Sequence, residues 1–284
     1  MEQLIEKEKK LSSYNGEDRV VKSTEIAEHL AGQRNPFSFM SKIPSIDEWS
    51  EGFEAGELIV ISGLTGQGKT SWARTLSFNF FAQSIPSLWF SYEMTYRQFL
   101  KDLHEDLFVF MPMVLKGRSM DWIQDRIHEA KIKHGVRAVF IDHLHFLVDM
   151  AKIRNPSLEI GAIVRGLKKI ALELNVTIFL IAHLTKTKFE EEPELDAIRD
   201  SSFIPQDSDQ VYIVWRKYDN SAKEYLNQTY VKLCKSRRTG TMGKKVLLTY
   251  KDKLYWEMEE RYGHDSQTRY EKRERYESRT LIDI

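Results

Sequence analysis

The sequence predicts an α/β domain in which a mainly parallel sheet is flanked by helices and ends in a C-terminal β-hairpin. Three observations support this class. Short apolar runs alternate with longer segments of helical periodicity, which is the pattern of strand–helix–strand units. The apolar runs are nearly continuous rather than alternating, as is typical of strands buried on both faces. A glycine-rich stretch joins the first of these runs to a helix.

The composition is that of one large folded domain with appendages. The 284 residues are 42% hydrophobic, which is enough for a sizeable core. The chain has 42 Lys and Arg and 42 Asp and Glu, so its net charge of +0 gives no overall electrostatic attraction to nucleic acid. Cys234 is the single cysteine, which excludes an internal disulfide framework and favours a reducing compartment, expected to be the cytoplasm. We expect no signal peptide and no membrane span, because no apolar run is long enough.

The first 35 residues are expected to form a charged tail and a linker helix. Residues 1–22 are predicted to be either a frayed helix followed by a loop or a disordered segment. Ser23 or Thr24 can cap a short helix over residues 25–32. The apolar residues on one side of that helix are Ile26, Ala27 and Leu30.

The main domain is expected over residues 36–258, and residues 259–284 are expected to form a charged tail. A linker is predicted to run from residue 35 to the first strand. The predicted strands cover residues 58–62, 87–91, 138–142, 177–182, 210–215, 230–234, 245–250 and 253–257, the last two as a hairpin. The predicted helices of this domain cover residues 71–83, 95–108, 120–134 and 156–174.

The glycine-rich stretch has the Walker A pattern G-x-x-x-x-G-K-T over residues 63–70. Glycines let the backbone wrap a phosphate, and the N–H groups of the loop and of the following helix then point at the anion. Lys69 is predicted to reach the β- and γ-phosphates of ATP, and the Thr70 hydroxyl to ligate Mg²⁺. A structural glycine turn is the alternative, which the flanking strand and helix disfavour. The residues predicted to bind ATP here are Gly63, Thr65, Gly66, Gln67, Gly68, Lys69, Thr70 and Ser71.

Polar residues follow the next three strands, at the edge where open α/β sheets bind ligands. Glu93 is a candidate base that polarises water, although spacing alone slightly favours a carboxylate at a helix start. Asp142 ends its strand in the Walker B pattern and is predicted to direct Mg²⁺. His183 either senses the γ-phosphate or is an ordinary loop histidine. His143 and His145 have no third ligand at a suitable spacing, so we predict that they are loop and packing residues rather than a metal site.

Several short segments, taken in order, carry a resemblance to a known family. They are residues 43–47, 91–94, 140–144, 182–184, 207–209 and 235–237. With the Walker A stretch they resemble the motif series of the DnaB-type (superfamily 4) hexameric replicative DNA helicases. The phage primase-helicase and Twinkle branch is most similar, because it also has a histidine where bacterial DnaB proteins usually have glutamine. The resemblance covers roughly residues 44–256 and implies a RecA-like P-loop NTPase core.

The resemblance implies roles for individual residues. Glu93 would be the catalytic glutamate, Asp142 the Mg²⁺-directing aspartate, and His183 the phosphate sensor that couples hydrolysis to DNA-contacting loops. Lys235 and Arg237 would form a basic pair that enters the ATP site of the neighbouring subunit, with Arg237 as the arginine finger. Two further residues match positions that sandwich the base in the phage branch: Arg216 and Tyr250.

The implied function is that of a ring-forming, ATP-driven helicase or translocase that acts on single-stranded DNA in replication, in a bacterial or phage setting. The partners would be other copies of the chain, in a hexamer, and the DNA strand in its centre. Lys152 and Lys188 are candidate DNA contacts within the loops 150–155 and 186–199. The sequence shows no primase, zinc ribbon or helical N-terminal domain, so a separate primase or loader is an expected partner. Residues 199–203 depart from the family's glycine-containing segment, which leaves the mode of strand contact open.

Two other functions stay open at this level. One is a RecA-like recombination or repair ATPase that coats DNA as a filament, and particle imaging separates a filament from a closed ring. The other is a KaiC-like regulatory ATPase that binds proteins and no DNA, and a single-strand binding assay separates the two classes.

Overall fold

The computed structural model describes residues 1–31, 36–117, 119–147, 155–184, 192–198 and 203–258. The chain divides into two units, Met1–Phe37 and Ser38–Ile284. The first unit contains helices α1 (Glu2–Ser12) and α2 (Ser23–Ala31), and α2 buries none of its residues. The expected tail at 259–284 lies outside the described residues.

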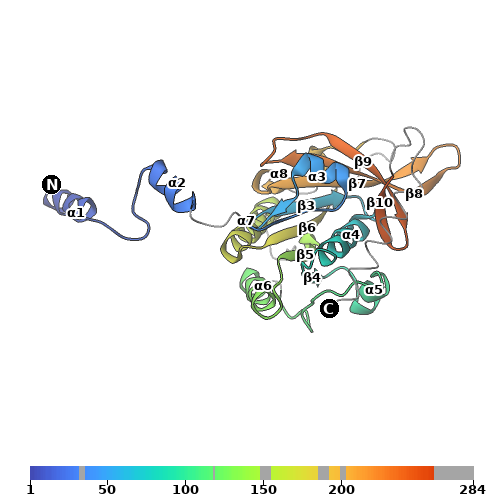
Figure 1. Ribbon diagram of the computed structural model, residues 1–284, viewed down its shortest axis with the longest axis horizontal. Coiled ribbons are helices and arrows are strands. Elements are labelled where there is room, and N and C mark those ends of the chain that lie inside the picture. Colours follow the sequence, from blue (N-terminus) through green and yellow to red (C-terminus); the bar gives the residue numbers. More distant parts are fainter. Residues whose placement is uncertain (32–35, 118, 148–154, 185–191, 199–202, 259–284) are drawn as a thin grey trace. The chain divides into compact units, whose positions relative to one another are not determined.

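The second unit is built on one large sheet, in the strand order β10-β9-β8-β7-β3-β6-β5-β4 (Figure 1). Strands β7, β3, β6, β5 and β4 run parallel to one another, whereas β8, β9 and β10 add antiparallel strands. The bounds are β3 Leu58–Gly63, β4 Ser87–Ser91, β5 Ala138–Asp142, β6 Thr177–His183, β7 Gln210–Asp219, β8 Glu224–Ser236, β9 Lys244–Lys251 and β10 Leu254–Glu257. The predicted fold class, with its C-terminal hairpin, is therefore confirmed.

Helices cover both faces of this sheet because successive strand residues point to opposite sides. Ile59 and Ile61 of β3 pack toward α3 (Pro44–Ser50), α4 (Lys69–Phe81) and α5 (Tyr96–Lys101). Leu58 and Val60 pack toward the other layer, which contains α6 (Met120–His134), α7 (Pro156–Leu174) and α8 (Phe203–Asp207). Two short 3-10 helices, Leu144–Phe146 and Leu195–Ala197, also occur among the described residues.

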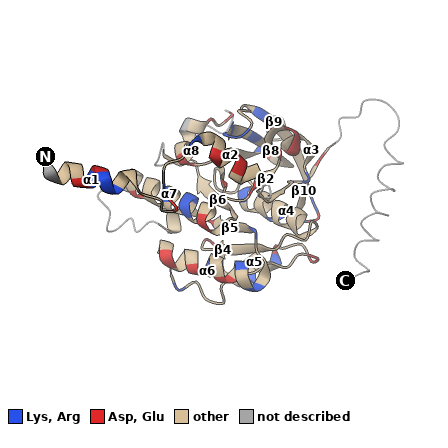
Figure 2. Ribbon diagram, turned by 60° about the vertical axis from the view of Figure 1, so that its left-hand side comes forward, with Lys and Arg blue, Asp and Glu red and all other residues tan. Residues whose placement is uncertain are grey.

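Three strands of the parallel part of the sheet contain no charged residue: β3, β4 and β6. Strands β4 and β6 carry no Lys, Arg, Asp or Glu and are tan in Figure 2, whereas α1 and α6 show charged residues of both signs. Both faces of β3, β4 and β6 are buried, which explains why their sequences are continuous apolar runs. Among the described helices, none has the length and apolar content needed to cross a bilayer.

The helix predicted over residues 95–108 is wrong in length. A capping box between Thr95 and Gln98 starts α5, but the helix ends at Lys101. The Lys253 ammonium donates hydrogen bonds to the carbonyls of Lys101 (3.0 Å) and Leu103 (2.7 Å). A side chain from the C-terminal hairpin thus occupies carbonyls that a longer helix would have used.

The linker predicted before the first strand is also wrong, because this stretch is folded. Pro44 begins helix α3, a position where its missing N–H costs nothing. Asp47 accepts hydrogen bonds from the backbone N–H groups of Ser41 (2.7 Å) and Lys42 (3.0 Å). Strands β1 (Ser38–Phe39) and β2 (Phe53–Glu54) pair on either side of α3.

Candidate functional site: a nucleotide pocket at the carboxyl edge of the sheet

The loop after β3 has the backbone that the glycine pattern predicts. Gly66 and Gly68 have φ values of 75° and 95°, in the left-handed region that glycine adopts most readily. A Cβ atom on Gly68 would collide with the Tyr255 hydroxyl, and one on Gly63 would collide with the Val214 carbonyl. Gly63 therefore serves close packing between strands, while Gly66 and Gly68 shape the loop itself.

A pocket of about 340 Å³ opens beside this loop. Most of the predicted ATP-binding residues line it, and residues from β7, β8, β9 and β10 close its far side. Gly63 and Gln67 are not among its lining residues. The lining residues are Thr65, Gly66, Gly68, Lys69, Thr70, Ser71, Glu93, His183, Arg216, Asn227, Thr229, Tyr250 and Tyr255.

The Lys69 side chain is held inside this pocket. Its ammonium donates hydrogen bonds to the Leu64 carbonyl (2.9 Å) and to Nδ1 of His183 (3.2 Å). Burial lowers the Lys69 pKa to about 8, against the opposing charges of Glu93 and Asp142. Burial, together with the positive charge of Lys69, lowers the His183 pKa to about 4, so this ring is neutral at pH 7. A neutral ring can accept the ammonium's hydrogen bond.

Thr70 and Asp142 meet as the Walker pair predicts. The Thr70 hydroxyl donates a hydrogen bond to Oδ2 of Asp142 across 2.9 Å. The other oxygen of this buried carboxylate, Oδ1, has no hydrogen-bond partner among the described residues. Burial, and then the Glu93 charge, raise the Asp142 pKa to about 6. A buried, unpartnered carboxylate oxygen beside a hydroxyl fits an Mg²⁺ ion, which prefers oxygen ligands.

His143, predicted to be a loop and packing residue, also contacts Glu93. Nδ1 of His143 lies 3.2 Å from Oε2 of Glu93, and this hydrogen bond is the largest cause of the lowered Glu93 pKa. The His143 and His183 rings are also neighbours, with centroids 4.2 Å apart. The ionised form of Glu93 at the pocket is thereby stabilised. His145 lies near both rings, at 5.7 Å and 5.9 Å.

The far side of the pocket contains both residues predicted to hold the base. The Arg216 backbone N–H donates to Oε1 of Gln67 (2.7 Å), so Gln67 fastens the loop to β7. The Arg216 guanidinium donates to the carbonyls of Tyr225 (3.2 Å) and Leu226 (3.1 Å), which fixes its plane. Tyr250 stands opposite Tyr255 across the β9–β10 pair.

Sequence reasoning missed three residues on this side of the pocket: Asn227, Thr229 and Tyr255. Asn227 and Thr229 belong to the part of β8 that precedes the predicted strand. The regular alternation of the hairpin could have indicated Tyr255, since it shares a cross-strand pair with Tyr250.

Lys235 and Arg237 lie at the opposite end of the strands from the pocket, near the start of β3. Ser236, between them, is paired with Gln210, which is paired with Ile59 near the start of β3. The glycine loop begins at the other end of β3, so strand length alone separates the two regions by about 13 Å or more. Lys235 donates to the Ser208 carbonyl (2.8 Å), and Arg237 pairs with Asp209 (3.0 Å). In this chain the basic pair therefore does not reach its own pocket.

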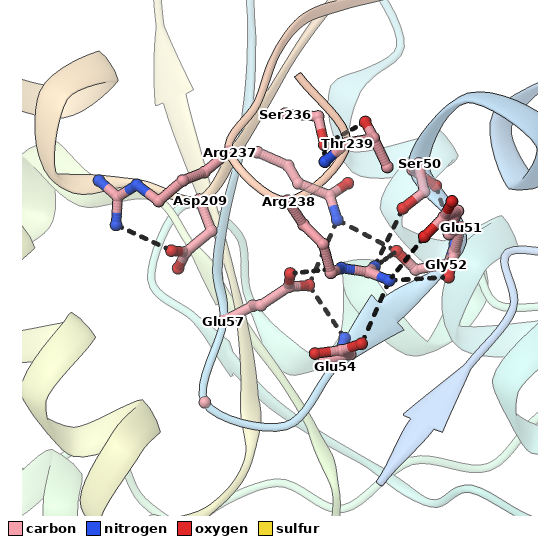
Figure 3. A network of polar contacts seen from close by, with 12 residues as sticks. Ser50, Glu51, Gly52, Glu54, Glu57, Asp209, Ser236, Arg237, Arg238 and Thr239 are labelled. Atoms are coloured by element: carbon pink, nitrogen blue, oxygen red, sulfur yellow. Dashed lines mark hydrogen bonds and ion pairs between the residues drawn. The ribbon is translucent and has the colours of Figure 1, made fainter. Parts of the chain in front are cut away.

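An adjacent arginine anchors this edge (Figure 3). Arg238 donates hydrogen bonds to the carbonyls of Ser50 (3.0 Å), Glu51 (3.2 Å) and Gly52 (2.8 Å). It also pairs with Glu54 (3.2 Å) and with the buried Glu57 (3.3 Å), whose pKa is raised by burial. The network ties the turn after β8 to the segment between α3 and β3.

The order and placement of these motifs are shared with known proteins. The sequence matches the family described as "DnaB-like helicase C terminal domain" over residues 39–105 and 102–257. The chain belongs to this family. The match includes every residue that lines the pocket, together with Lys235 and Arg237.

Curated relatives agree with this DnaB-like assignment. A "Probable plasmid replicative DNA helicase" of Chlamydia psittaci is 25% identical over 238 residues, covering 70% of this chain and 52% of the relative. A "Replicative DNA helicase DnaB" of Rickettsia felis is 33% identical over 102 residues, covering 35% of this chain and 21% of the relative. The chain thus spans about half the length, or less, of these curated relatives.

Two solved structures share the fold. One, whose title describes an ATPase domain, has a TM-score of 0.68 at 22% identity and covers 84% of this chain and 97% of that chain. The other, "The Structure Of A DnaB-Like Replicative Helicase And Its Interactions With Primase", has a TM-score of 0.69 at 21% identity and covers 91% of this chain and 71% of that chain. The predicted RecA-like P-loop core is confirmed by this likeness. The candidate DNA contacts Lys152 and Lys188, and residues 199–202 of the departing segment, lie outside the described residues.

Proposed function

We propose that this DnaB-like chain is an ATP-driven helicase or translocase motor that acts on single-stranded DNA in replication. It would work as a homo-oligomeric ring, a hexamer, in which each ATP site lies between two copies. The proposal rests on one observation: the residues predicted to act in ATP hydrolysis lie at two opposite ends of the strands of one sheet. Lys69, Thr70 and Asp142 meet at the pocket, whereas Arg237 lies at the other end of β3.

The pocket's own groups suit phosphoryl transfer to water. The loop amides and Lys69 would hold the phosphates, and Glu93 would orient the attacking water. Thr70 and Oδ1 of Asp142 would hold Mg²⁺, which supplies charge neutralisation at the phosphates when bound. His183 contacts Lys69 directly, so it is placed to respond when Lys69 turns toward a γ-phosphate.

A head-to-tail ring would bring the second edge of one copy to the pocket of the next. Heterologous interfaces of this kind generate rings when the rotation closes. The exposed Arg237 would then complete the neighbour's site as an arginine finger, a contribution of roughly 10³- to 10⁵-fold in rate in related NTPases. Primase or a loader would be a separate partner, and the cytoplasm the site of action.

Mixing two inactive variants tests the shared site. Lys69→Ala removes the phosphate-binding ammonium and Arg237→Ala removes the finger, so each protein alone should lack DNA-stimulated ATPase activity. In a random one-to-one mixture, about a quarter of the sites pair an intact Lys69 with an intact Arg237 across an interface. We expect activity to return in that proportion after subunit exchange. A mixture no more active than its two components would contradict the proposal.

The DNA ligand is tested separately. Full-length protein with a non-hydrolysable ATP analogue should bind a fluorescent single strand, with an affinity that falls steeply with salt. Electron microscopy of the same sample should show closed rings. Open filaments would favour the recombination ATPase, and no binding at low salt would favour the regulatory ATPase.

A further inference from the structure

Glu93, His143 and His183 form a cluster of potential metal ligands at the pocket edge. They follow or end the adjacent strands β4, β5 and β6, whose paired backbones fix their spacing. One ligand atom of each residue lies within 4.8 Å of those of the other two. The cluster does not include Thr70 or Asp142, whose side chains offer only oxygen atoms.

The donor atoms suit zinc better than magnesium. Two imidazoles and one carboxylate are ligands that Zn²⁺ and Co²⁺ accept readily, whereas Mg²⁺ prefers an all-oxygen shell. Tetrahedral zinc with bonds of about 2.0–2.1 Å holds its ligand atoms roughly 3.3 Å apart. The Glu93 Oε2 and His143 Nδ1 atoms are already 3.2 Å apart. All three ligand atoms lie within 4.8 Å of one another, and Glu93 is partly exposed, so its side chain has room to adjust.

We propose that Glu93, His143 and His183 bind a Zn²⁺-type dication and that the bound ion inhibits ATP hydrolysis. The ion takes the position of the proton that His143 shares with Glu93, and that ring then carries its proton on Nε2. Water fills the fourth position. The inhibition rests on the proposed function, because it follows from the removal of Glu93 and His183 from their roles in hydrolysis. The binding itself does not depend on that function.

The positive charge of Lys69 should weaken metal binding at this cluster but not at an unrelated surface site. Its ammonium lies 3.2 Å from Nδ1 of His183, where its positive charge repels a dication. An uncharged residue at this position should therefore bind the metal more tightly, although it abolishes hydrolysis. The ligand variants and the Lys69 variant are thus expected to change metal affinity in opposite directions.

Visible absorption of Co²⁺ provides the test, with full-length protein in Mg²⁺-free buffer. We expect the absorption of four-coordinate Co²⁺ to saturate near one ion per chain and to disappear on addition of Zn²⁺. His143→Ala and His183→Ala should each weaken Co²⁺ binding by about tenfold or more, and Lys69→Met should tighten it by about threefold or more. His145→Ala is the matched control, because His145 is in the same loop but outside the cluster, and it should bind like the unchanged chain. Circular dichroism shows whether each variant is folded.

Two results would overturn the site: Co²⁺ absorption that is unchanged in the folded His143→Ala and His183→Ala variants, or Lys69→Met that binds no more tightly. The inhibition is measured by adding micromolar Zn²⁺ to the ATPase reaction in excess Mg²⁺, with reversal by a chelator. Co²⁺ binding as expected without inhibition would leave the site intact and overturn the role of Glu93 in hydrolysis. The two failures are therefore distinguishable.

Discussion

Asp209 holds Arg237 with one carboxylate oxygen and the start of β3 with the other. Oδ1 lies 3.0 Å from Nη1 of Arg237, whereas Oδ2 accepts hydrogen bonds from the Leu58 N–H (2.8 Å) and the Lys168 ammonium (2.6 Å). The Arg237 side chain is nevertheless 50% exposed. Nη2 of Arg237 also donates a hydrogen bond to the Gln206 carbonyl (2.8 Å), so the guanidinium is held in one orientation while its exposed side can meet a second partner, such as a phosphate of a neighbouring copy's nucleotide.

Arg237→Ala should lower DNA-stimulated ATPase activity by about 10³-fold, with little change in melting temperature. The matched control is Arg165→Ala, because Arg165 is 53% exposed and pairs with Asp207 at 3.4 Å in the same region. Steady-state ATPase assays of both variants with single-stranded DNA check the expectation. Equal activity of the two variants would contradict the arginine-finger role.

Arg238→Ala should instead destabilise the fold. It removes the guanidinium that donates to Oε1 of the buried Glu57 and to the carbonyls of Ser50 and Glu51. Oε2 of Glu57 and the Gly52 carbonyl keep a hydrogen bond from the Gln210 amide. Because Arg238 is largely buried, we expect a loss of about 2–4 kcal/mol in the free energy of unfolding. Arg238→Lys should recover little, because a single ammonium cannot reproduce the planar fork. Chemical denaturation of both variants against Arg165→Ala measures the effect, and an unchanged midpoint for Arg238→Ala would refute it.

Asp142→Asn should stabilise the Mg²⁺-free protein at pH 8. Burial raises the Asp142 pKa to about 6, so the folded state binds this proton more tightly than the unfolded chain. The resulting stability is fully present below the unfolded pKa and is lost as pH rises through about 6. An uncharged amide avoids that loss, which is worth about 1–3 kcal/mol. Thermal melts in a chelator should show a gain at pH 8 that vanishes near pH 4. The same variant should lose Mg²⁺-dependent nucleotide binding.

The Cys234 thiol should be nearly inert in the folded protein. Burial raises its pKa to about 12, against an ordinary value of 9.0, so its thiolate fraction at pH 8 falls by about 10³-fold. Labelling with a thiol reagent at pH 8 should be slow in native buffer and fast in denaturant. Comparable rates in the two conditions would show that β8 opens readily at this position.

The strands that are buried at every position were predicted accurately from the sequence. The runs at 58–62, 87–91 and 138–142 are buried on both faces, so continuous apolar patterns located them almost to the residue. The ends of β7 and β8 were missed because they pair mainly with each other and are partly exposed, which permits polar residues such as Glu224 and Asn227. The pattern of apolar residues along one segment does not show which other strand pairs with it.

The site was predicted unevenly for a similar physical reason. Lys69, Thr70 and Asp142 belong to motifs whose spacing follows from strand and loop geometry, and the structure brings them together. The contact between His143 and Glu93 joins residues 50 positions apart, through the pairing of β4 with β5. That pairing depends on the order of the strands in the sheet, which the spacing of residues in the sequence does not give. Whether Lys235 and Arg237 act in a second copy depends on an assembly, which no single chain specifies.

The β3 strand has a consequence of its own for communication between copies. The Leu58 N–H at its start donates a hydrogen bond to the Asp209 carboxylate, which also pairs with Arg237. Gly63 at its end is the first residue of the phosphate-binding loop. The strand is six residues long, roughly 20 Å of stiff, fully buried backbone. In the proposed ring, a displacement of Arg237 at one subunit interface would be transmitted along β3 to the nucleotide at the other interface, and hydrolysis at neighbouring sites would then be coupled.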